Sequence, residues 1–199
     1  MVLYTIGHSI RPMEEFLGLL KDHRIAVLVD VRAFPVSRRN PHFHHENLRA
    51  VLPEAGVEYV WMGKELGGYR KGTEDLGERS PNKGWKAEGF RIYADYMMTE
   101  GFRPAAARLL ELAREQALAY MCAEKLPRQC HRQLLSDYLH TLGHEVRHII
   151  EPDVVQTHEL TYFARFKEGV LTYPHFEEPS TPLNESRRAP ENVCVSGVA

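Results

Sequence analysis

Residues 117–132 read ALAYMCAEKLPRQCHR, and this stretch decides how the rest of the chain is interpreted. Its first six residues, 117–122, are short, apolar and bounded, which predicts a buried strand. Pro127 then suits the first turn of a helix that we expect to run to Leu142, with Gly143 as its C-terminal cap. Open α/β sheets bind ligands where a strand ends and a helix begins. The stretch therefore predicts a functional site as well as two elements of the fold.

The other segments alternate between strand and helix patterns. Further strands are predicted at 2–6, 25–31, 57–62 and 144–150. Further helices are predicted after Ser9, over 46–55, and over 90–116 as two helices broken near Gly101 and Pro104. Alternation of this kind predicts an α/β fold in three layers, with a parallel or mostly parallel sheet of about five strands flanked by helices.

The 199 residues fit one domain. We expect a single α/β domain over 1–176, with a core at 2–150 and a C-terminal extension at 151–176 that holds a small hairpin around Glu168 and Gly169. Residues 177–199, rich in Pro, Ser, Asn and Glu, are expected to form a mobile polar tail. The stretch 63–89 contains seven glycines and is predicted to be a long loop.

Composition limits the class of protein. Hydrophobic residues make up 43% and charged residues 26% of the chain, as in globular proteins, and the formal net charge of −2 argues against non-specific coating of nucleic acid. Three cysteines, an odd number, argue against a disulfide-stapled secreted scaffold. The N-terminus does not resemble a signal peptide, and no apolar run reaches the roughly 20 residues of a membrane helix. We expect a cytoplasmic protein with no membrane partner.

In a parallel sheet the C-terminal ends of the strands share one edge, and ionisable groups follow four of the five predicted strands. A crevice above such an edge is the usual position of a ligand. The residues at these four ends are Gly7 to Ser9, Asp30 and Arg32, Met62 to Lys64, and Cys122 to Glu124, and His148 in the fifth predicted strand is a further candidate.

Two chemistries at the central stretch remain alternatives. Cys122 and Arg128 have the C-x5-R spacing of a cysteine phosphatase, in which a thiolate lies below a cradle of amides. The intervening AEKLP has no glycine, however, and Glu124 would repel a phosphate. A metal could use Cys122, Cys130, His131 and His8, but C-x7-C-H is not a recognised zinc spacing, so we expect no metal and no cofactor.

The loop 34–45, FPVSRRNPHFHH, carries Arg38 and Arg39 among aromatic residues. Together with Tyr69, Arg70 and Trp85, this composition suits a nucleotide or exposed bases, and simple surface solvation is the alternative interpretation.

Five sequence motifs follow one another along the chain: YTIGHS (4–9), VDVRAFPVSRRNPHF (29–43), LGGYR (66–70), GFRIYADYM (89–97) and MCAEKLPRQCHR (121–132). In this order they resemble the domain of unknown function 488 family over nearly all of 2–150. The resemblance implies a compact α/β fold but no established reaction. The motif positions that it implies are His8, Asp30, Arg32, Asn40, Arg70, Glu124, Cys130, His131 and Arg132.

The leading hypothesis is an enzyme, of hydrolase or transferase type, acting on a phosphate-bearing or other anionic substrate such as a nucleotide or a nucleic-acid end. The candidate catalytic residues are Glu124, His131, His8 and Asp30. The candidate substrate-binding residues are Arg32, Asn40, Arg70, Cys130 and Arg132. A non-catalytic nucleic-acid-binding module is one alternative, and a cysteine-dependent phosphatase or sulfurtransferase-like enzyme is another. The pattern does not indicate an oligomeric state.

Overall fold

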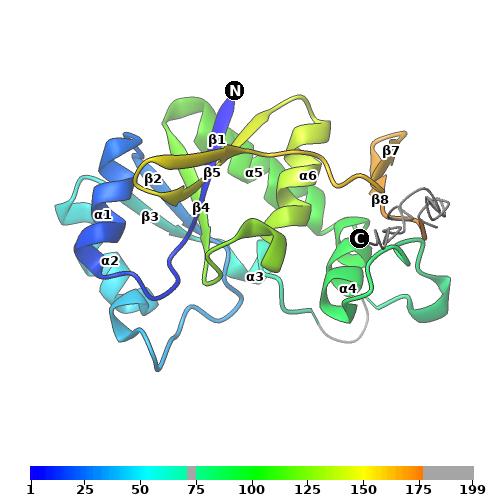
Figure 1. The fold of residues 1–199 in the computed structure, drawn as a ribbon, viewed down its shortest axis with the longest axis horizontal. Helices are drawn as coiled ribbons and strands as arrows, with labels where there is room; N and C mark the ends of the chain where they lie inside the picture. Colours follow the sequence, from blue (N-terminus) through cyan, green and yellow to red (C-terminus); the bar gives the residue numbers. More distant parts are fainter. Residues whose placement is uncertain (71–74, 177–199) are drawn as a thin grey trace, which may run out of the picture.

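The computed structural model describes residues 1–70 and 75–176, and its centre is a six-stranded sheet (Figure 1). The strands lie in the order β3-β2-β4-β1-β5-β6, and the first five run parallel. Their bounds are β1 Val2–Gly7, β2 Val27–Asp30, β3 Glu58–Trp61, β4 Leu118–Cys122, β5 Glu145–Glu151 and β6 Val154–Thr157. The predicted α/β class with a mostly parallel sheet is therefore confirmed.

The apolar runs form strands because these strands are covered on both faces. β2 and β4 are buried along their whole length. Leu118, Tyr120 and Cys122 belong to one hydrophobic cluster, whereas Ala119 and Met121 belong to the other. Successive side chains of a strand point to opposite faces, so Cys122 lies on the same face as Tyr120.

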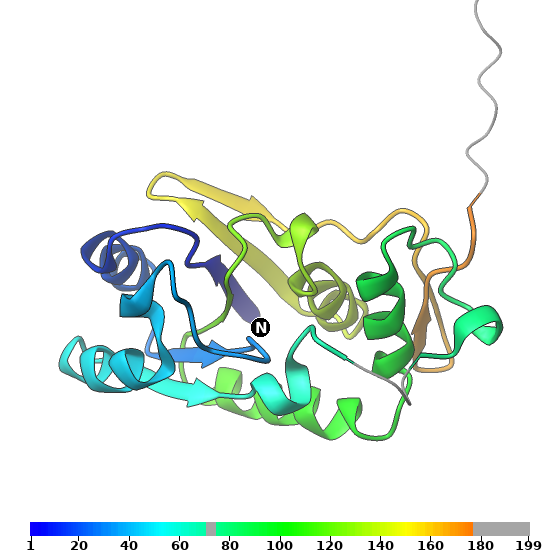
Figure 2. The same ribbon diagram turned by 90° about the horizontal axis from the view of Figure 1, so that it is seen from below.

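The two clusters are covered by different helices, which gives three layers (Figures 1 and 2). Helices α1 (Met13–Asp22) and α2 (His45–Glu54) contribute to the cluster that holds Met121. Helices α4 (Glu88–Met97), α5 (Phe102–Glu115) and α6 (Arg132–Thr141) contribute to the cluster that holds Cys122. The chain leaves β1 toward β2 and leaves β4 toward β5, so the strand order switches direction between the adjacent strands β1 and β4.

Three local expectations need correction. Pro127 begins a short 3-10 turn, Pro127–Gln129, and α6 begins only at Arg132, so Cys130 and His131 precede the helix. The stretch 63–89 is not only loop, because it contains α3 (Gly63–Leu66) and a 3-10 turn, Gly77–Arg79. A sixth strand, β6, pairs antiparallel with β5 at the sheet edge.

The C-terminal extension forms the predicted hairpin from β7 (Arg165–Lys167) and β8 (Val170–Thr172). Glu168 and Gly169 both have positive φ, which a two-residue turn between these strands requires. Leu171 and Tyr173 belong to the cluster under α4–α6. The expected tail at 177–199 lies outside the described residues. Within the described ranges, no helix has both the length and the apolar character needed to cross a bilayer.

Candidate functional site

A cavity of about 840 Å³ opens over the C-terminal ends of β1, β2 and β4, where the strand order switches direction. Its lining combines reactive side chains at the strand ends with the loop that follows β2. The lining includes His8, Arg32, Phe34, Arg38, Arg39, Asn40, Gly68, Tyr69, Cys122, Glu124, Cys130 and His131.

The cavity contains two thiols beside an imidazole. The Sγ atoms of Cys122 and Cys130 and a ring nitrogen of His131 all lie within 4.8 Å of one another, and all three residues are buried. His131 Nε2 donates to the carbonyl of Val31 at 3.1 Å, so in neutral His131 the unprotonated nitrogen is Nδ1, 3.9 Å from Cys122 Sγ. A side chain at Gly68 would meet this ring, since its Cβ would lie 2.4 Å from His131 Nδ1.

The two thiols have different acidities. The interaction with the Cys130 thiol is the main cause that lowers the pKa of Cys122 to about 7. The Arg132 guanidinium and the backbone amides of Glu124 and Ala123 lower that pKa further, while burial opposes them. Burial and the contact with Cys122 raise the pKa of Cys130 well above its usual value. The pair therefore favours a thiolate at Cys122 and a thiol at Cys130.

Arg132, beside these thiols, is fully buried. Its Nε donates to Cys130 Sγ at 3.3 Å, and one terminal nitrogen donates to the carbonyls of Glu124 and Lys125. The other terminal nitrogen donates to Thr5 Oγ1 at 3.0 Å. Among the described residues Arg132 forms no ion pair with a carboxylate. A buried cation needs compensation by negative charge, and a thiolate at Cys122, whose pKa Arg132 lowers, can supply it.

A chain of buried hydrogen bonds continues from Arg132 to Asp137. Thr5 Oγ1 lies 2.9 Å from His148 Nδ1, His148 Nε2 lies 3.0 Å from His158 Nδ1, and His158 Nε2 lies 2.9 Å from an Asp137 carboxylate oxygen. Because a carboxylate only accepts and a guanidinium only donates, His158 donates to Asp137 at one end of the chain and Arg132 donates to Thr5 at the other. Burial, followed by His158 and Arg132, lowers the pKa of His148 to about 3.

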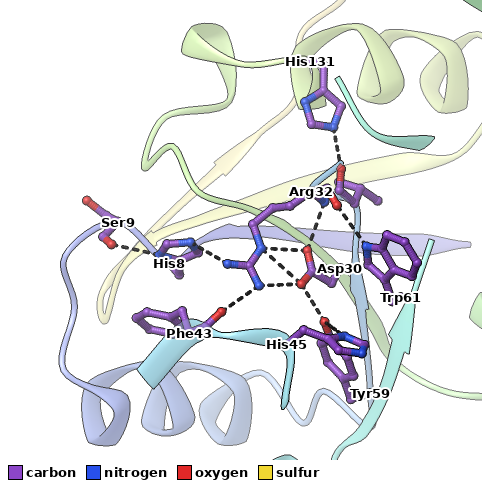
Figure 3. A network of polar contacts seen from close by, with 10 residues as sticks. His8, Ser9, Asp30, Arg32, Phe43, His45, Tyr59, Trp61 and His131 are labelled. Atoms are coloured by element: carbon purple, nitrogen blue, oxygen red, sulfur yellow. Dashed lines mark hydrogen bonds and ion pairs between the residues drawn. The ribbon is translucent and has the colours of Figure 1, made fainter. Parts of the chain in front are cut away.

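A second buried network fixes Arg32 (Figure 3). The Asp30 carboxylate accepts from the Arg32 amide and guanidinium, at 2.6–3.1 Å, and from the Tyr59 hydroxyl at 2.7 Å. Arg32 also donates to the carbonyl of Phe43 and to His8 Nε2, at 2.9 and 3.1 Å. Burial, followed by Arg32, lowers the pKa of His8 to about 4. His8 is therefore neutral, with its Nδ1 donating to a carbonyl.

The mouth of the cavity is basic and aromatic. Arg38 and Arg39 are exposed, and among the described residues neither forms an ion pair. Phe34 and Tyr69, 63% and 51% exposed, meet edge to face with their ring centres 5.1 Å apart. Glu124 is the one lining carboxylate in the described structure. Because Asp30 already neutralises Arg32, the charged side chains that face solvent here have a net positive charge.

Of the nine predicted site residues, six line the cavity: His8, Arg32, Asn40, Glu124, Cys130 and His131. The other three lie outside the lining. Asp30 is fully buried in its ion pair, and Arg132 is directed into the protein. Arg70 packs its guanidinium 3.6 Å above the ring centre of Tyr96 and donates to the carbonyls of Lys64 and Glu65.

Cys122 lines the cavity although it was not among the predicted site residues. Its position at the end of a buried strand was the signal that could have found it. The other half of the C-x5-R pattern, Arg128, is exposed and does not line the cavity, and the guanidinium next to the thiols comes from Arg132. Since this guanidinium already supplies buried positive charge and a closed zinc site needs four ligands, we interpret Cys122, Cys130 and His131 as a thiol site, not as a metal centre.

Comparison with protein families gives a match to the family described as "Domain of unknown function DUF488", over residues 12–139. The matched region includes β2, β4 and every residue of the thiol site, and it ends within α6. No curated protein and no solved structure matches this chain.

Proposed function

Because this chain belongs to the DUF488 family, whose description names no reaction, its function must be inferred from its own site, and we propose a cysteine-dependent enzyme that acts on a phosphate-bearing, anionic substrate. The observation that carries the proposal is the position of Cys122. Its thiol lies in a cavity at the end of an inner parallel strand, close to the thiol of Cys130. The buried Arg132 guanidinium, which contacts Cys130 and has no carboxylate partner in the described structure, lowers the pKa of Cys122.

The charges around the cavity support an anionic substrate. Arg38 and Arg39 project at its mouth and outnumber Glu124, so the field favours an approaching anion. The exposed rings of Phe34 and Tyr69 supply an apolar surface on which a base or another flat group can stack. A nucleotide, or a nucleotide unit at a nucleic-acid end, combines both features.

In the proposed reaction the Cys122 thiolate attacks the electrophilic atom of the substrate, forming a bond from Sγ while the bond to the leaving group breaks. Glu124 is the lining carboxyl group available to protonate that leaving group, and water or a second acceptor then releases the product from sulfur. His131 and Arg132 hold the thiol pair in place. Arg32 and His8, joined by a hydrogen bond, fix the wall formed by the ends of β1 and β2.

Alkylation of Cys122 tests the anion site before a substrate is known. Iodoacetate and iodoacetamide react at the same kind of carbon but differ in charge. We expect Cys122 to prefer iodoacetate several-fold more than a free cysteine peptide does, and inorganic phosphate to slow both reactions. The R38Q/R39Q double variant should lose this preference. R49Q/R108Q, with the same loss of charge at exposed positions outside the cavity, should keep it.

Turnover tests the catalytic role. A panel of phosphomonoesters and nucleotides is assayed for product with wild-type protein and Cys122→Ser at equal concentration. Activity present in the wild type and absent from a folded Cys122→Ser variant supports the nucleophile. Equal activity in both proteins contradicts the proposal. So does an alkylation rate of Cys122 that changes neither with phosphate nor with the charge of the reagent.

A further inference from the structure

The two cysteines of the site stand in different structural contexts. Cys122 ends β4, an inner strand hydrogen-bonded to β1 on one side and β2 on the other, so its backbone is fixed. Cys130 lies between a 3-10 turn and α6 with extended dihedral angles, φ −146° and ψ 171°. Both residues line the cavity, where small solutes can reach them. We propose that Cys122 and Cys130 form a reversible redox pair, in which a hydroperoxide oxidises Cys122 and Cys130 closes a disulfide with it.

The geometry brings the two sulfurs within reach. Their Sγ atoms are no more than 4.8 Å apart. A disulfide needs about 2.05 Å between sulfurs, so the pair has to close by less than 3 Å. The segment able to make this movement is the one that carries Cys130, because it is not held in a helix or in the sheet.

The difference between the thiols assigns their roles. The deprotonated sulfur is the one that attacks a peroxide, and the buried guanidinium of Arg132 favours that state at Cys122. Cys130 keeps its proton and is aimed at the sulfur that becomes oxidised. This arrangement corresponds to an attacking cysteine with a resolving cysteine next to it.

Oxidation of the thiol pair takes place in two steps. In the first, the Cys122 thiolate attacks one oxygen of the hydroperoxide, the O–O bond breaks, and a proton joins the departing oxygen. The products are Cys122 sulfenic acid and water or an alcohol. In the second, the Cys130 sulfur attacks the sulfenic sulfur, the S–O bond breaks, and hydroxide leaves as water with the Cys130 proton. Two electrons pass from the thiol pair to the hydroperoxide, and an external thiol reverses the oxidation.

Disulfide formation would regulate the proposed enzyme at its own nucleophile. This inference rests on the proposed function only in requiring a thiolate at Cys122. The disulfide removes the proposed nucleophile from the cavity. It also moves Cys130 away from the Nε atom of Arg132. Hydroperoxide would therefore silence the enzyme, and a reducing thiol would restore it.

Mass spectrometry of the full chain tests the redox pair without any substrate. All proteins carry Cys194→Ser, because Cys194 lies outside the described residues and would offer a third thiol. After brief treatment with hydrogen peroxide, we expect the intact mass to fall by two hydrogen atoms and the peptide map to join Cys122 to Cys130. Reduction with dithiothreitol should reverse both changes. In Cys130→Ser, Cys122 should instead accumulate sulfenic acid that dimedone captures, and Cys122→Ser should give neither product.

Two results overturn the redox pair. One is a Cys122 sulfenic acid that persists in protein with Cys130 intact, and the other is peroxide leaving both thiols unmodified. These outcomes are separate from those of the proposed function. If the disulfide forms but phosphate does not slow alkylation, the redox pair is supported and the proposal of an anionic substrate is contradicted. If phosphate slows alkylation but no disulfide forms, the anionic substrate is supported and the redox pair is contradicted.

Discussion

Removing the Cys130 thiol should raise the pKa of Cys122 and thereby change how its reactivity depends on pH. The interaction with the Cys130 thiol is the leading cause of a pKa of about 7 at Cys122. Cys130→Ala deletes this thiol, whereas Cys130→Ser replaces it with a hydroxyl that can donate a hydrogen bond. Both variants are made in a Cys194→Ser background, so that Cys122 is the one thiol left.

The size of the shift follows from the energy of the lost contact. A hydrogen bond to a charged group contributes roughly 1.5–3 kcal/mol, and one pKa unit corresponds to about 1.4 kcal/mol, so Cys130→Ala should raise the pKa of Cys122 by roughly one to two units. At pH 7 the thiolate fraction then falls from about one half to about one tenth or less. A more basic thiolate is also more nucleophilic, with a Brønsted slope of about 0.4–0.5, so the rate at pH 7 falls less than this fraction does.

The midpoint of a pH profile is therefore the quantity to measure, not the rate at a single pH. Iodoacetamide is used because it is neutral, and the alkylation rate of Cys122 is followed from pH 5.5 to pH 10 by mass spectrometry. Cys130→Ser should keep a midpoint near that of the wild type, while Cys130→Ala moves toward the value of an ordinary thiol. A midpoint equal in wild type and Cys130→Ala would refute the role of Cys130 as donor.

Other predictions concern stability and can be checked by chemical denaturation. The pKa of His148 is about 3 in the folded chain against 6.5 as its ordinary value, so below pH 6.5 the unfolded chain takes up a proton that the folded chain excludes. From pH 7 to pH 5 this should remove about 2 kcal/mol of the free energy of unfolding, and His148→Gln should reduce that loss. Gly68→Ala should displace the His131 ring and lower the melting temperature by several degrees, whereas Gly18→Ala, in open space on α1, should not. Asp30→Asn should cost about 3–5 kcal/mol, because it leaves a buried guanidinium unpaired; a change below about 1 kcal/mol would contradict this interpretation.

Most of the fold could be predicted because buried parallel strands have a strong sequence signature. The run that became β4 is apolar throughout, the run that became β2 is apolar up to Asp30, and both strands are covered by helices on two faces. β6 could not be predicted in the same way. All four of its residues are exposed, so its sequence carries no hydrophobic pattern imposed by burial. The start of α6 was misplaced for a different reason. Proline suits the first turn of a 3-10 helix as well as that of an α-helix, and the sequence does not distinguish them.

The candidate site could be predicted as a place but not as a set of roles. The rule that strand ends of a parallel sheet meet at one edge brought His8, Cys122 and Glu124 to one cavity. The rule could not assign a role to each arginine. A guanidinium can bind a ligand or stabilise the protein by internal hydrogen bonds, and the sequence shows the same residue type in both cases. Arg32 and Arg132 have become internal donors, while the arginines at the mouth come from a loop whose course depends on tertiary packing.

The position of Arg132 explains how a segment outside the matched family region contributes to the site. Its buried charge is linked to the carboxylate of Asp137 by a chain that passes through His148 and His158, both beyond residue 139. The two rings thus keep Arg132 oriented without neutralising it at close range. Its charge stays available to the Cys122 sulfur and the cavity, as a site for thiolate chemistry on an anion requires.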